Sequence, residues 1–400
     1  MDAAPRTALE TRHHNRIADL APEAAEWRRD LHRHPEIGFE ERRTAAFVAE
    51  RLRAFGVDEV IEGIARTGVV GLIRGRAEGP AIGLRADMDA LPMQERNAFG
   101  HASTLPGRMH ACGHDGHTAM LLAAAKALAE TRDFAGTVAV IFQPAEEGGG
   151  GGREMMEDGL VARTGIESIW GLHNWPDLPL GAFATLEGPV MAGIDYFDVT
   201  VKGQGTHAGT PHNGADTVLA AAHLVTAIQS VPGRSLPPTA VATVGVSMFK
   251  GADAHVIMPA EATIGGSVRY FDPVARDRAE ARIRTLANSV AAGFECEAVI
   301  DYRRNYPPCL NPGPEREIAA EVAAGLVGPA RVIREREPSM AGEDFAFMLN
   351  ERPGHYVWMG TASPDHRSGA LHYPDYDFND AAIPHGVAYW LGLVDRLLPA

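Results

Sequence analysis

Residues 110–117 contain a thiol, three imidazoles and a carboxylate within eight positions. These are the side-chain types that bind transition metals, and the stretch comes just before a predicted helix. Cys112 and His114 are two positions apart, so in an extended segment their side chains would share one face and could bind neighbouring metals. The alternative is a loop whose polar side chains cap the following helix. We interpret the stretch as a candidate metal-binding segment.

Two adjacent carboxylates, Glu146 and Glu147, follow the predicted strand 138–142. Open α/β sheets place their sites at the carboxyl ends of strands. One carboxylate could bind metal while the other faces a bound water, but only if the chain bends, which Pro144 and the glycines at 148–152 allow. The alternative is a solvated acidic loop. A nucleotide-binding loop is excluded, because the G-x-G-x-x-G spacing fails and two acids would repel phosphate.

Four further residues, at three places in the chain, add side chains of the same types. His173 ends the predicted strand 168–172, and His372 comes shortly before the last predicted helix; taken alone, each is more typical of a structural histidine. Asp87 and Asp89 close the predicted strand 81–85, where carboxylates could orient a metal-bound histidine or could lie in a surface turn.

Together these side chains form a set of Cys, His, Glu and Asp at the ends of several strands. Two metal ions would be needed to use them all. Paired divalent ions activate a water and polarise a carbonyl, with a nearby carboxylate as general base, which is hydrolase chemistry. The chain has neither the H-E-x-x-H motif of single-zinc peptidases nor the G-x-S-x-G motif of serine hydrolases.

The elements that position these residues predict an α/β fold. Short apolar runs suited to buried strands alternate with helical patterns. The predicted strands are 69–73, 81–85, 137–142 and 168–172, and the predicted helices are two within 24–55, one at 117–129 and one at 381–398.

From about residue 193 the pattern changes to β-α-β-β-α-β, which is typical of a ferredoxin-like unit. Its predicted elements are strand 196–201, helix 215–230, strands 240–248 and 262–270, helix 273–292 and strand 298–302. We therefore predict a first domain over 1–190, an inserted domain over 191–304, and a return to the first domain over 305–400.

Composition excludes several functions. The chain of 400 residues has 52 acidic and 37 basic residues, a formal charge of −15, and no basic run to follow a nucleic-acid backbone. Its three lysines are not preceded by glycine, which excludes the phosphate loop of ATPases. Three cysteines are too few for a disulfide framework. With no apolar run long enough for a membrane span and no signal-like start, we predict a cytoplasmic protein without nucleic-acid or membrane partners.

The ordered motifs resemble peptidase family M20, a family of metallopeptidases and amidohydrolases, and within it subfamily D, which includes hippurate hydrolases, auxin-conjugate hydrolases and N-acyl-amino-acid amidohydrolases. The similar segments are 31–36, 85–92, 109–120, 142–151, 171–175, 207–216, 342–347 and 371–380. The resemblance implies a metal-dependent aminopeptidase-like catalytic domain, a mixed sheet flanked by helices, with an inserted α+β lid and dimerisation domain.

The resemblance also implies roles for individual residues. The implied ligands of two divalent ions (zinc, manganese, nickel or cobalt) are Cys112, His114, Glu147, His173 and His372. Glu146 is the implied general base, and Asp89 is the implied supporting carboxylate. Other branches of the family have Asp in place of the cysteine, so Cys112 favours the acyl-amino-acid branch.

In the inserted domain, His207 matches a histidine that stabilises the oxyanion in the partner subunit's active site. Arg269 matches the group that binds the substrate carboxylate, with a surface salt bridge as the alternative. We also expect Asn174 to bind substrate. Where the family has an Asn-Val-Ile-Pro-like stretch, this chain has His-Val-Ile-Met-Pro starting at His255, which we place with the substrate-binding residues.

The predicted reaction is hydrolysis of the amide bond of an N-acyl amino acid to a carboxylic acid and a free amino acid. The substrate is a small molecule, and the predicted assembly is a homodimer through the lid domain, or a tetramer. Two alternatives stay open: a dipeptidase of the same fold with the same site, and a metal-binding sensor that has lost turnover.

Overall fold

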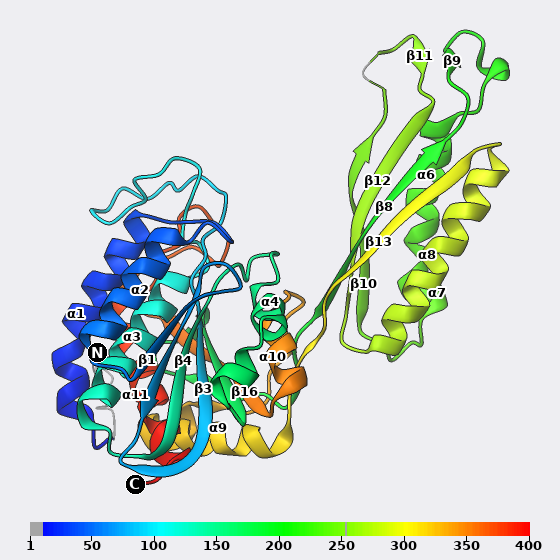
Figure 1. The fold of residues 1–400 in the computed structure, drawn as a ribbon. Helices are drawn as coiled ribbons and strands as arrows, with labels where there is room; N and C mark the ends of the chain where they lie inside the picture. Colours follow the sequence, from blue (N-terminus) through cyan, green and yellow to red (C-terminus); the bar gives the residue numbers. More distant parts are fainter. Residues whose placement is uncertain (1–10, 253) are drawn as a thin grey trace. The chain divides into compact units, whose positions relative to one another are not determined.

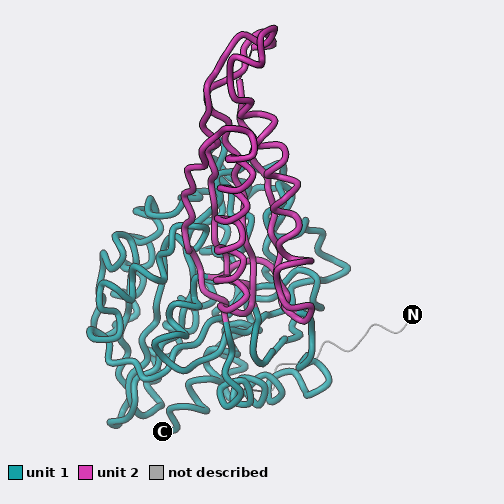
Figure 2. The backbone as a smooth tube through the Cα atoms, turned by 90° about the vertical axis from the view of Figure 1, so that its right-hand side faces the viewer, with its two compact units in different colours: residues 1–190, 310–337, 344–400 teal, residues 191–309, 338–343 magenta. Residues whose placement is uncertain are grey.

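The computed structural model describes residues 11–252 and 254–400, and these form two compact units. Of the described residues, unit 1 comprises 11–190, 310–337 and 344–400, and unit 2 comprises 191–252, 254–309 and 338–343 (Figure 2). These units divide the chain after Val190 and after Cys309 and give residues 338–343 to unit 2. The domain bounds 1–190, 191–304 and 305–400 stay a prediction from the sequence. Residues 338–343 contact the start of unit 2: the N–H of Ala192, between β7 and β8, donates to the carbonyls of Ser339 and Ala341.

Unit 1 is built on an eight-stranded mixed sheet in the order β1-β2-β4-β3-β5-β16-β6-β15 (Figure 1). Strands β3, β4, β5 and β16 run parallel to one another. The pairs β1–β2, β2–β4 and β6–β16 are antiparallel, and β15 pairs parallel with β6. The strands are β1 (Glu59–Ile64), β2 (Gly68–Arg74), β3 (Ala77–Asp87), β4 (Ala135–Gln143), β5 (Ser168–Pro179), β6 (Phe183–Ala184), β15 (Val332–Ile333) and β16 (Gly354–Ala362).

Helices cover both faces of this sheet (Figure 1). On one face α1, α3 and α11 pack against one another, and on the other α4 packs against α10. The helices of unit 1 are α1 (His14–Arg33), α2 (Arg42–Ala54), α3 (His114–Thr131), α4 (Gly151–Glu157), α5 (Leu160–Thr164), α9 (Gly313–Val327), α10 (Phe345–Glu351) and α11 (Ile383–Leu397). Across the described residues, no helix combines the length and the apolar character that a bilayer crossing requires.

The central strands are buried on both faces, as their apolar sequences predict. Leu84 of β3, Val140 of β4 and Leu172 of β5 are at most 1% exposed. They pack with α3, which is almost entirely buried because alanine, leucine and methionine occupy most of its turns. The core therefore fixes the carboxyl ends of three parallel strands, where the polar residues begin.

Unit 2 has the predicted β-α-β-β-α-β order. Its sheet is antiparallel, in the order β10-β12-β8-β13, and Figure 1 shows the helices α6, α7 and α8 on one side of it. The elements are β8 (Gly193–Lys202), β9 (Thr206–His207), α6 (Thr217–Ile228), α7 (Ser230–Ser235), β10 (Ala242–Lys250), β11 (Ile257–Met258), β12 (Glu261–Tyr270), α8 (Pro273–Gly293) and β13 (Glu297–Tyr306). Two short strands, β7 (Gly188–Met191) and β14 (Cys309–Asn311), carry the chain across the unit boundary.

Candidate active site

The site forms where β3, β4 and β5 end side by side in unit 1. In the parallel register Asp87, the last residue of β3, is opposite Gln143, the last residue of β4. On the other side Arg85 of β3 is opposite Gly171 of β5, so His173 lies level with Asp87. The sheet therefore brings the aspartate pair, the glutamate pair and His173 to one edge, as the sequence predicted.

The Cys112–His114 segment is not extended, contrary to the prediction that the two side chains would share one face of an extended segment. Gly113 has φ +90° and is the N-cap of α3, so His114 is already helical. A Cβ at Gly113 would lie 2.4 Å from Asn174 Nδ2 and 2.5 Å from Tyr376 Oη. The left-handed turn, which only glycine adopts here without strain or a clash, sets the directions of the two flanking side chains.

The Glu146–Glu147 turn bends sharply, as its predicted role requires. Ala145 has φ +51°, an uncommon conformation for a residue with a side chain, and Gly148 has φ +84°. Asp89 holds this turn: its Oδ1 accepts the Glu146 N–H at 3.0 Å and its Oδ2 accepts the Glu147 N–H at 2.9 Å. Asp89 thus supports the site by fixing the main chain of both glutamates.

Hydrogen bonds at one ring nitrogen fix the orientation of two histidines. Nδ1 of His114 lies 2.9 Å from the Asp89 carbonyl, and Nδ1 of His173 lies 2.7 Å from the Asn174 carbonyl. A carbonyl only accepts, so each Nδ1 donates and each neutral ring keeps a lone pair on Nε2. Nε2 of His173 is 3.4 Å from Cys112 Sγ, and Nε2 of His114 is buried without a hydrogen-bond partner.

His372 completes the set from the segment before α11. Its main chain is left-handed, with φ +64°, and its N–H donates to the Ala111 carbonyl at 2.8 Å. Its Nε2 lies 3.1 Å from Glu147 Oε1. A strained main-chain conformation that is held by a specific hydrogen bond is common at functional sites.

The candidate ligand atoms form overlapping groups. Within each group every pair of ligand atoms lies within 4.8 Å. Three groups are linked through Glu147 or His114: Cys112–Glu147–His372, His114–Glu146–Glu147 and Asp87–His114–His117–His173. A fourth, Glu146–Glu343–Asp344, shares Glu146 with the second. All five predicted ligands are therefore brought together, and the overlap suits two neighbouring divalent ions.

The electrostatics of the cluster also fit cations. Burial raises the pKa of the Cys112 thiol well above its ordinary value, and the negative charges of Glu147 and Glu146 raise it further. Burial lowers the pKa of His114, but Asp87 and Asp89 outweigh it and raise the pKa to about 10. Thiolate and neutral imidazole are the metal-binding forms of these side chains. The raised pKa values mean that the surrounding carboxylates favour the protonated forms, so metal cations are needed to replace the protons.

Burial lowers the pKa of His173 well below its ordinary value, which keeps this ring neutral and able to bind metal.

Sequence reasoning did not assign His117 or the full role of Asp87. His117 Nε2 accepts the Asn174 N–H at 2.9 Å, so its Nδ1 carries the proton and donates to Asp87 Oδ1 at 2.6 Å. Both nitrogens of this ring are occupied, which makes His117 a support rather than a ligand. The Asp-x-Asp spacing of residues 87 and 89 was the only sequence signal for this arrangement.

The predicted substrate-binding residue Asn174 is fully buried. Its Nδ2 donates to the Cys112 carbonyl at 2.6 Å, and its Oδ1 accepts the Tyr376 hydroxyl at 2.8 Å. These bonds make the Asn174 amide a clamp on the Cys112 loop. Direct contact with substrate stays a prediction.

Three predicted residues lie in unit 2. His207 is exposed at the end of β9, opposite Ile257 of β11, and its Nδ1 accepts the Gly209 N–H at 3.0 Å, so a neutral ring carries its proton on Nε2. His255 is exposed in the turn before β11. Arg269 of β12 is partly buried and donates to the Met340 carbonyl at 2.6 Å, a main-chain contact rather than the salt bridge considered from the sequence.

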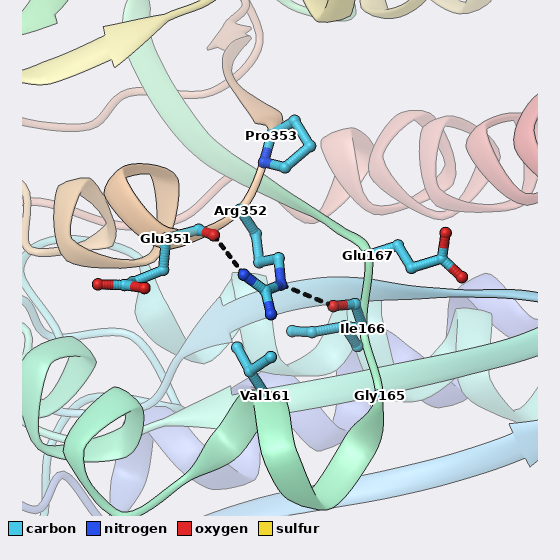
Figure 3. A pocket seen from close by; sticks show the side chains of 7 residues that line it. All are labelled: Val161, Gly165, Ile166, Glu167, Glu351, Arg352 and Pro353. Carbon is cyan, nitrogen blue, oxygen red and sulfur yellow. Dashed lines mark hydrogen bonds between the residues drawn. The ribbon is translucent and has the colours of Figure 1, made fainter.

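A pocket of about 490 Å³ lies elsewhere in unit 1, between the α5–β5 turn and the end of α10 (Figure 3). Figure 3 shows the Arg352 guanidinium across it, donating to the carbonyls of Ile166 and Glu351. These bonds join two turns, and none of the candidate ligands lines the pocket.

Several known proteins are similar to this chain in sequence and in fold. The model of peptidase family M20/M25/M40 matches residues 83–396. An N-acetylcysteine deacetylase of Bacillus subtilis (strain 168) is 38% identical over 92% of this chain and 94% of that protein. A hippurate hydrolase of Campylobacter jejuni is 37% identical over 96% of this chain and 98% of that protein.

The crystal structure of a dinuclear metal-binding peptidase of the M20 family from Bacillus subtilis superposes with a TM-score of 0.80 at 33% identity, over 94% of this chain and 98% of that one. The fold and the donor set thus define a metal-dependent hydrolase with a dinuclear site. The chain belongs to peptidase family M20/M25/M40.

Proposed function

We propose that this protein hydrolyses the amide bond of N-acyl amino acids. The observation that carries the proposal is the Glu146–Glu147 turn. Both main-chain N–H groups are bound by Asp89, and the two carboxylates share a group with His114 while only Glu147 also joins Cys112 and His372. Adjacent carboxylates in unequal surroundings can divide ligand and base roles.

The residues then take the following roles. Cys112, His114, Glu147, His173 and His372 hold the ions. Two divalent ions held there supply an activated water and polarise the substrate carbonyl. Glu146 accepts the proton of the attacking water and delivers it to the leaving amine, so the products are a carboxylic acid and an amino acid, and the Glu146 carboxylate is restored.

The unit 2 residues are proposed to complete the site. An imidazole N–H at Nε2 of His207 is a suitable donor to the oxyanion, and the Arg269 guanidinium can bind a carboxylate. His255 lies in the exposed turn before β11, the strand that pairs with β9 at His207, and is proposed to contact substrate.

The cytoplasmic location stays a prediction from the sequence.

A homodimer through unit 2, or a tetramer built from such dimers, is supported by its sheet edges. The edge strand β13 carries Glu297, Asp301, Arg303 and Arg304, whereas the other edge strand, β10, has no charge before Lys250. Charges on an edge discourage pairing with another chain, and their absence permits it. We propose β10 as the strand at which two copies pair.

The testing experiment compares Glu146→Gln, Glu147→Gln and the exposed control Glu157→Gln after metal reconstitution. Acetyl, benzoyl and indoleacetyl amino acids and a set of dipeptides are assayed, with metal content measured on the same samples. We expect Glu146→Gln to keep two ions and lose hydrolysis, and Glu147→Gln to lose metal. Full activity of Glu146→Gln would refute the general base. Preference for dipeptides would favour the peptidase, and absence of turnover in the metal-loaded wild type would favour the sensor.

A further inference from the structure

A buried polar network in unit 1 has no part in the roles given above. Asp344 lies directly before α10 and is fully buried. Its Oδ1 accepts from Gln143 Nε2 at 2.7 Å and from Arg85 Nη2 at 3.2 Å, and its Oδ2 accepts the Gly152 N–H at 2.7 Å. One carboxylate thereby joins β3, β4 and α4.

This use of the carboxylate is unusual for its position. Asp344 is the N-cap of α10, where an aspartate side chain normally accepts an N–H of its own helix. Here the side chain makes no capping bond and points into the network instead. The Asp344 carbonyl accepts the Phe347 N–H of α10 at 3.0 Å, while its side chain ties the same residue to the end of the sheet.

The same residue contacts the proposed base. The Asp344 N–H donates to Glu146 Oε1 at 3.4 Å. The chain also passes from unit 2 back into unit 1 between residues 343 and 344, so this N–H lies on the first residue of the returning segment. The bonds of the Asp344 carboxylate to Gln143, Arg85 and the Gly152 N–H therefore help to fix the direction of that N–H.

Arg85 extends the network toward the other supports. Its Nε donates to Gln143 Oε1 at 2.8 Å and its Nη1 to Asp87 Oδ2 at 2.7 Å. Asp87 in turn holds His117. A single buried guanidinium therefore compensates the charges of both Asp87 and Asp344, the desolvated carboxylates that need a partner to stay ionised.

We infer that Asp344, held by Gln143 and Arg85, is a positioning residue that directs its N–H to the carboxylate of Glu146 and so orients the base for proton transfer. The inference rests on the proposed function, because it requires Glu146 to be the base. A positioning role acts on the chemical step, so its loss should lower kcat while substrate binding and metal content stay the same.

The test uses Asp344→Asn, which keeps the size of the side chain. Both carboxylate oxygens face donors, so either orientation of the amide places an N–H against another donor. The matched control is Asp158→Asn, whose carboxylate accepts the Ala65 N–H away from the cluster. We expect kcat of Asp344→Asn to fall at least about tenfold, the range for partners that orient functional side chains, with KM, two bound ions and the control unchanged.

The double variant Glu146→Gln/Asp344→Asn separates a positioning role from an independent one. If Asp344 acts through Glu146, the double variant is no slower than Glu146→Gln alone, because the losses do not add. Additive losses, a rise in KM without a fall in kcat, loss of metal, or unchanged kcat in Asp344→Asn would each overturn the inference. Should Asp344→Asn fail to fold, Gln143→Met, which removes one anchor without changing charge, decides by the same criteria.

The two proposals fail in different ways. An active Glu146→Gln would overturn the general base and this inference with it. An inactive Glu146→Gln beside a fully active Asp344→Asn would overturn this inference alone.

Discussion

The carboxylate of Asp89 accepts the main-chain N–H groups of Glu146 and Glu147 at once, one on each oxygen. A side chain two residues past the end of β3 thus sets the conformation of the turn that follows the neighbouring strand β4. An amide has only one acceptor oxygen, so asparagine at position 89 would leave one of these two N–H groups without its acceptor.

Asp89→Asn is expected to weaken metal binding by about 10- to 100-fold, since its NH₂ group would face one of the two N–H donors and loosen the turn. Calorimetric titration of zinc or manganese into metal-stripped protein measures the effect. The control Asp58→Asn changes a carboxylate that accepts only the Arg74 N–H from the main chain. Equal affinities in wild type and Asp89→Asn would contradict the supporting role.

Cys112→Ala is expected to hold fewer than two ions per chain, because it removes the only sulfur from the Cys112–Glu147–His372 group. Elemental analysis after dialysis against a fixed concentration of metal gives the stoichiometry. Cys296→Ala, at a partly buried thiol of unit 2, is the matched control. Two retained ions in Cys112→Ala would remove this residue from the ligand set.

Gly113→Ala is expected to cost about 2–4 kcal/mol of the free energy of unfolding, from a left-handed conformation and a clash with Asn174 and Tyr376. Gly107→Ala separates the two causes: Gly107 has φ +75° but no atom within 4 Å of an added Cβ, so it should cost only about 1–2 kcal/mol. Urea unfolding of both variants provides the comparison, and equal losses would show that crowding at Gly113 is unimportant.

His32 predicts a pH dependence of stability. Burial lowers the pKa of His32, and the positive charge of Arg28 lowers it further. The carboxylates of Asp115 and Glu95 outweigh both effects and raise the pKa from 6.5 to about 9. The folded state therefore binds the proton more tightly than the unfolded state. This stabilisation is fully present below about pH 6.5 and is lost as pH rises through 9.

The contribution is on the order of 3 kcal/mol, from about 1.4 kcal/mol for each pKa unit. Asp115 has a lowered pKa, so its own contribution is constant over this window. Urea unfolding between pH 6 and 9.5 should show a decline in wild type that is smaller in His32→Gln, where the raised pKa of His114 still contributes, and unchanged in the partly exposed control His34→Gln. Identical pH profiles in wild type and His32→Gln would contradict the prediction.

The sequence was informative wherever local pattern decides structure. Apolar runs predicted the buried strands β3, β4 and β5, and the polar residues after each run predicted the edge where the site lies. The βαββαβ order of unit 2 was predicted in the same way. Asp87, Glu147 and His173 could be expected to meet because parallel strands end at a common edge.

The rest depended on contacts that local pattern does not encode. The Gln143–Asp344 bond joins residues 201 positions apart, and no spacing rule indicates it. The left-handed turn at Gly113 replaced the predicted extended segment, because a single φ angle is set by the crowding of Asn174 and Tyr376 rather than by neighbours in sequence. The burial of the Asn174 amide likewise depends on Tyr376, from a distant segment.

The division of the chain bears on how the protein could be shortened. Unit 2 consists of two stretches, 191–309 and 338–343, so the polypeptide crosses between the units four times. Replacing residues 191–309 by a short linker would delete Ala192, the donor that binds the Ser339 and Ala341 carbonyls. The remaining hexapeptide would then lose its hydrogen bonds to Ala192 and to Arg269 and lead directly into Asp344. A catalytic core engineered from this chain would have to be made by two coordinated excisions, the second of them ending one residue before a buried carboxylate.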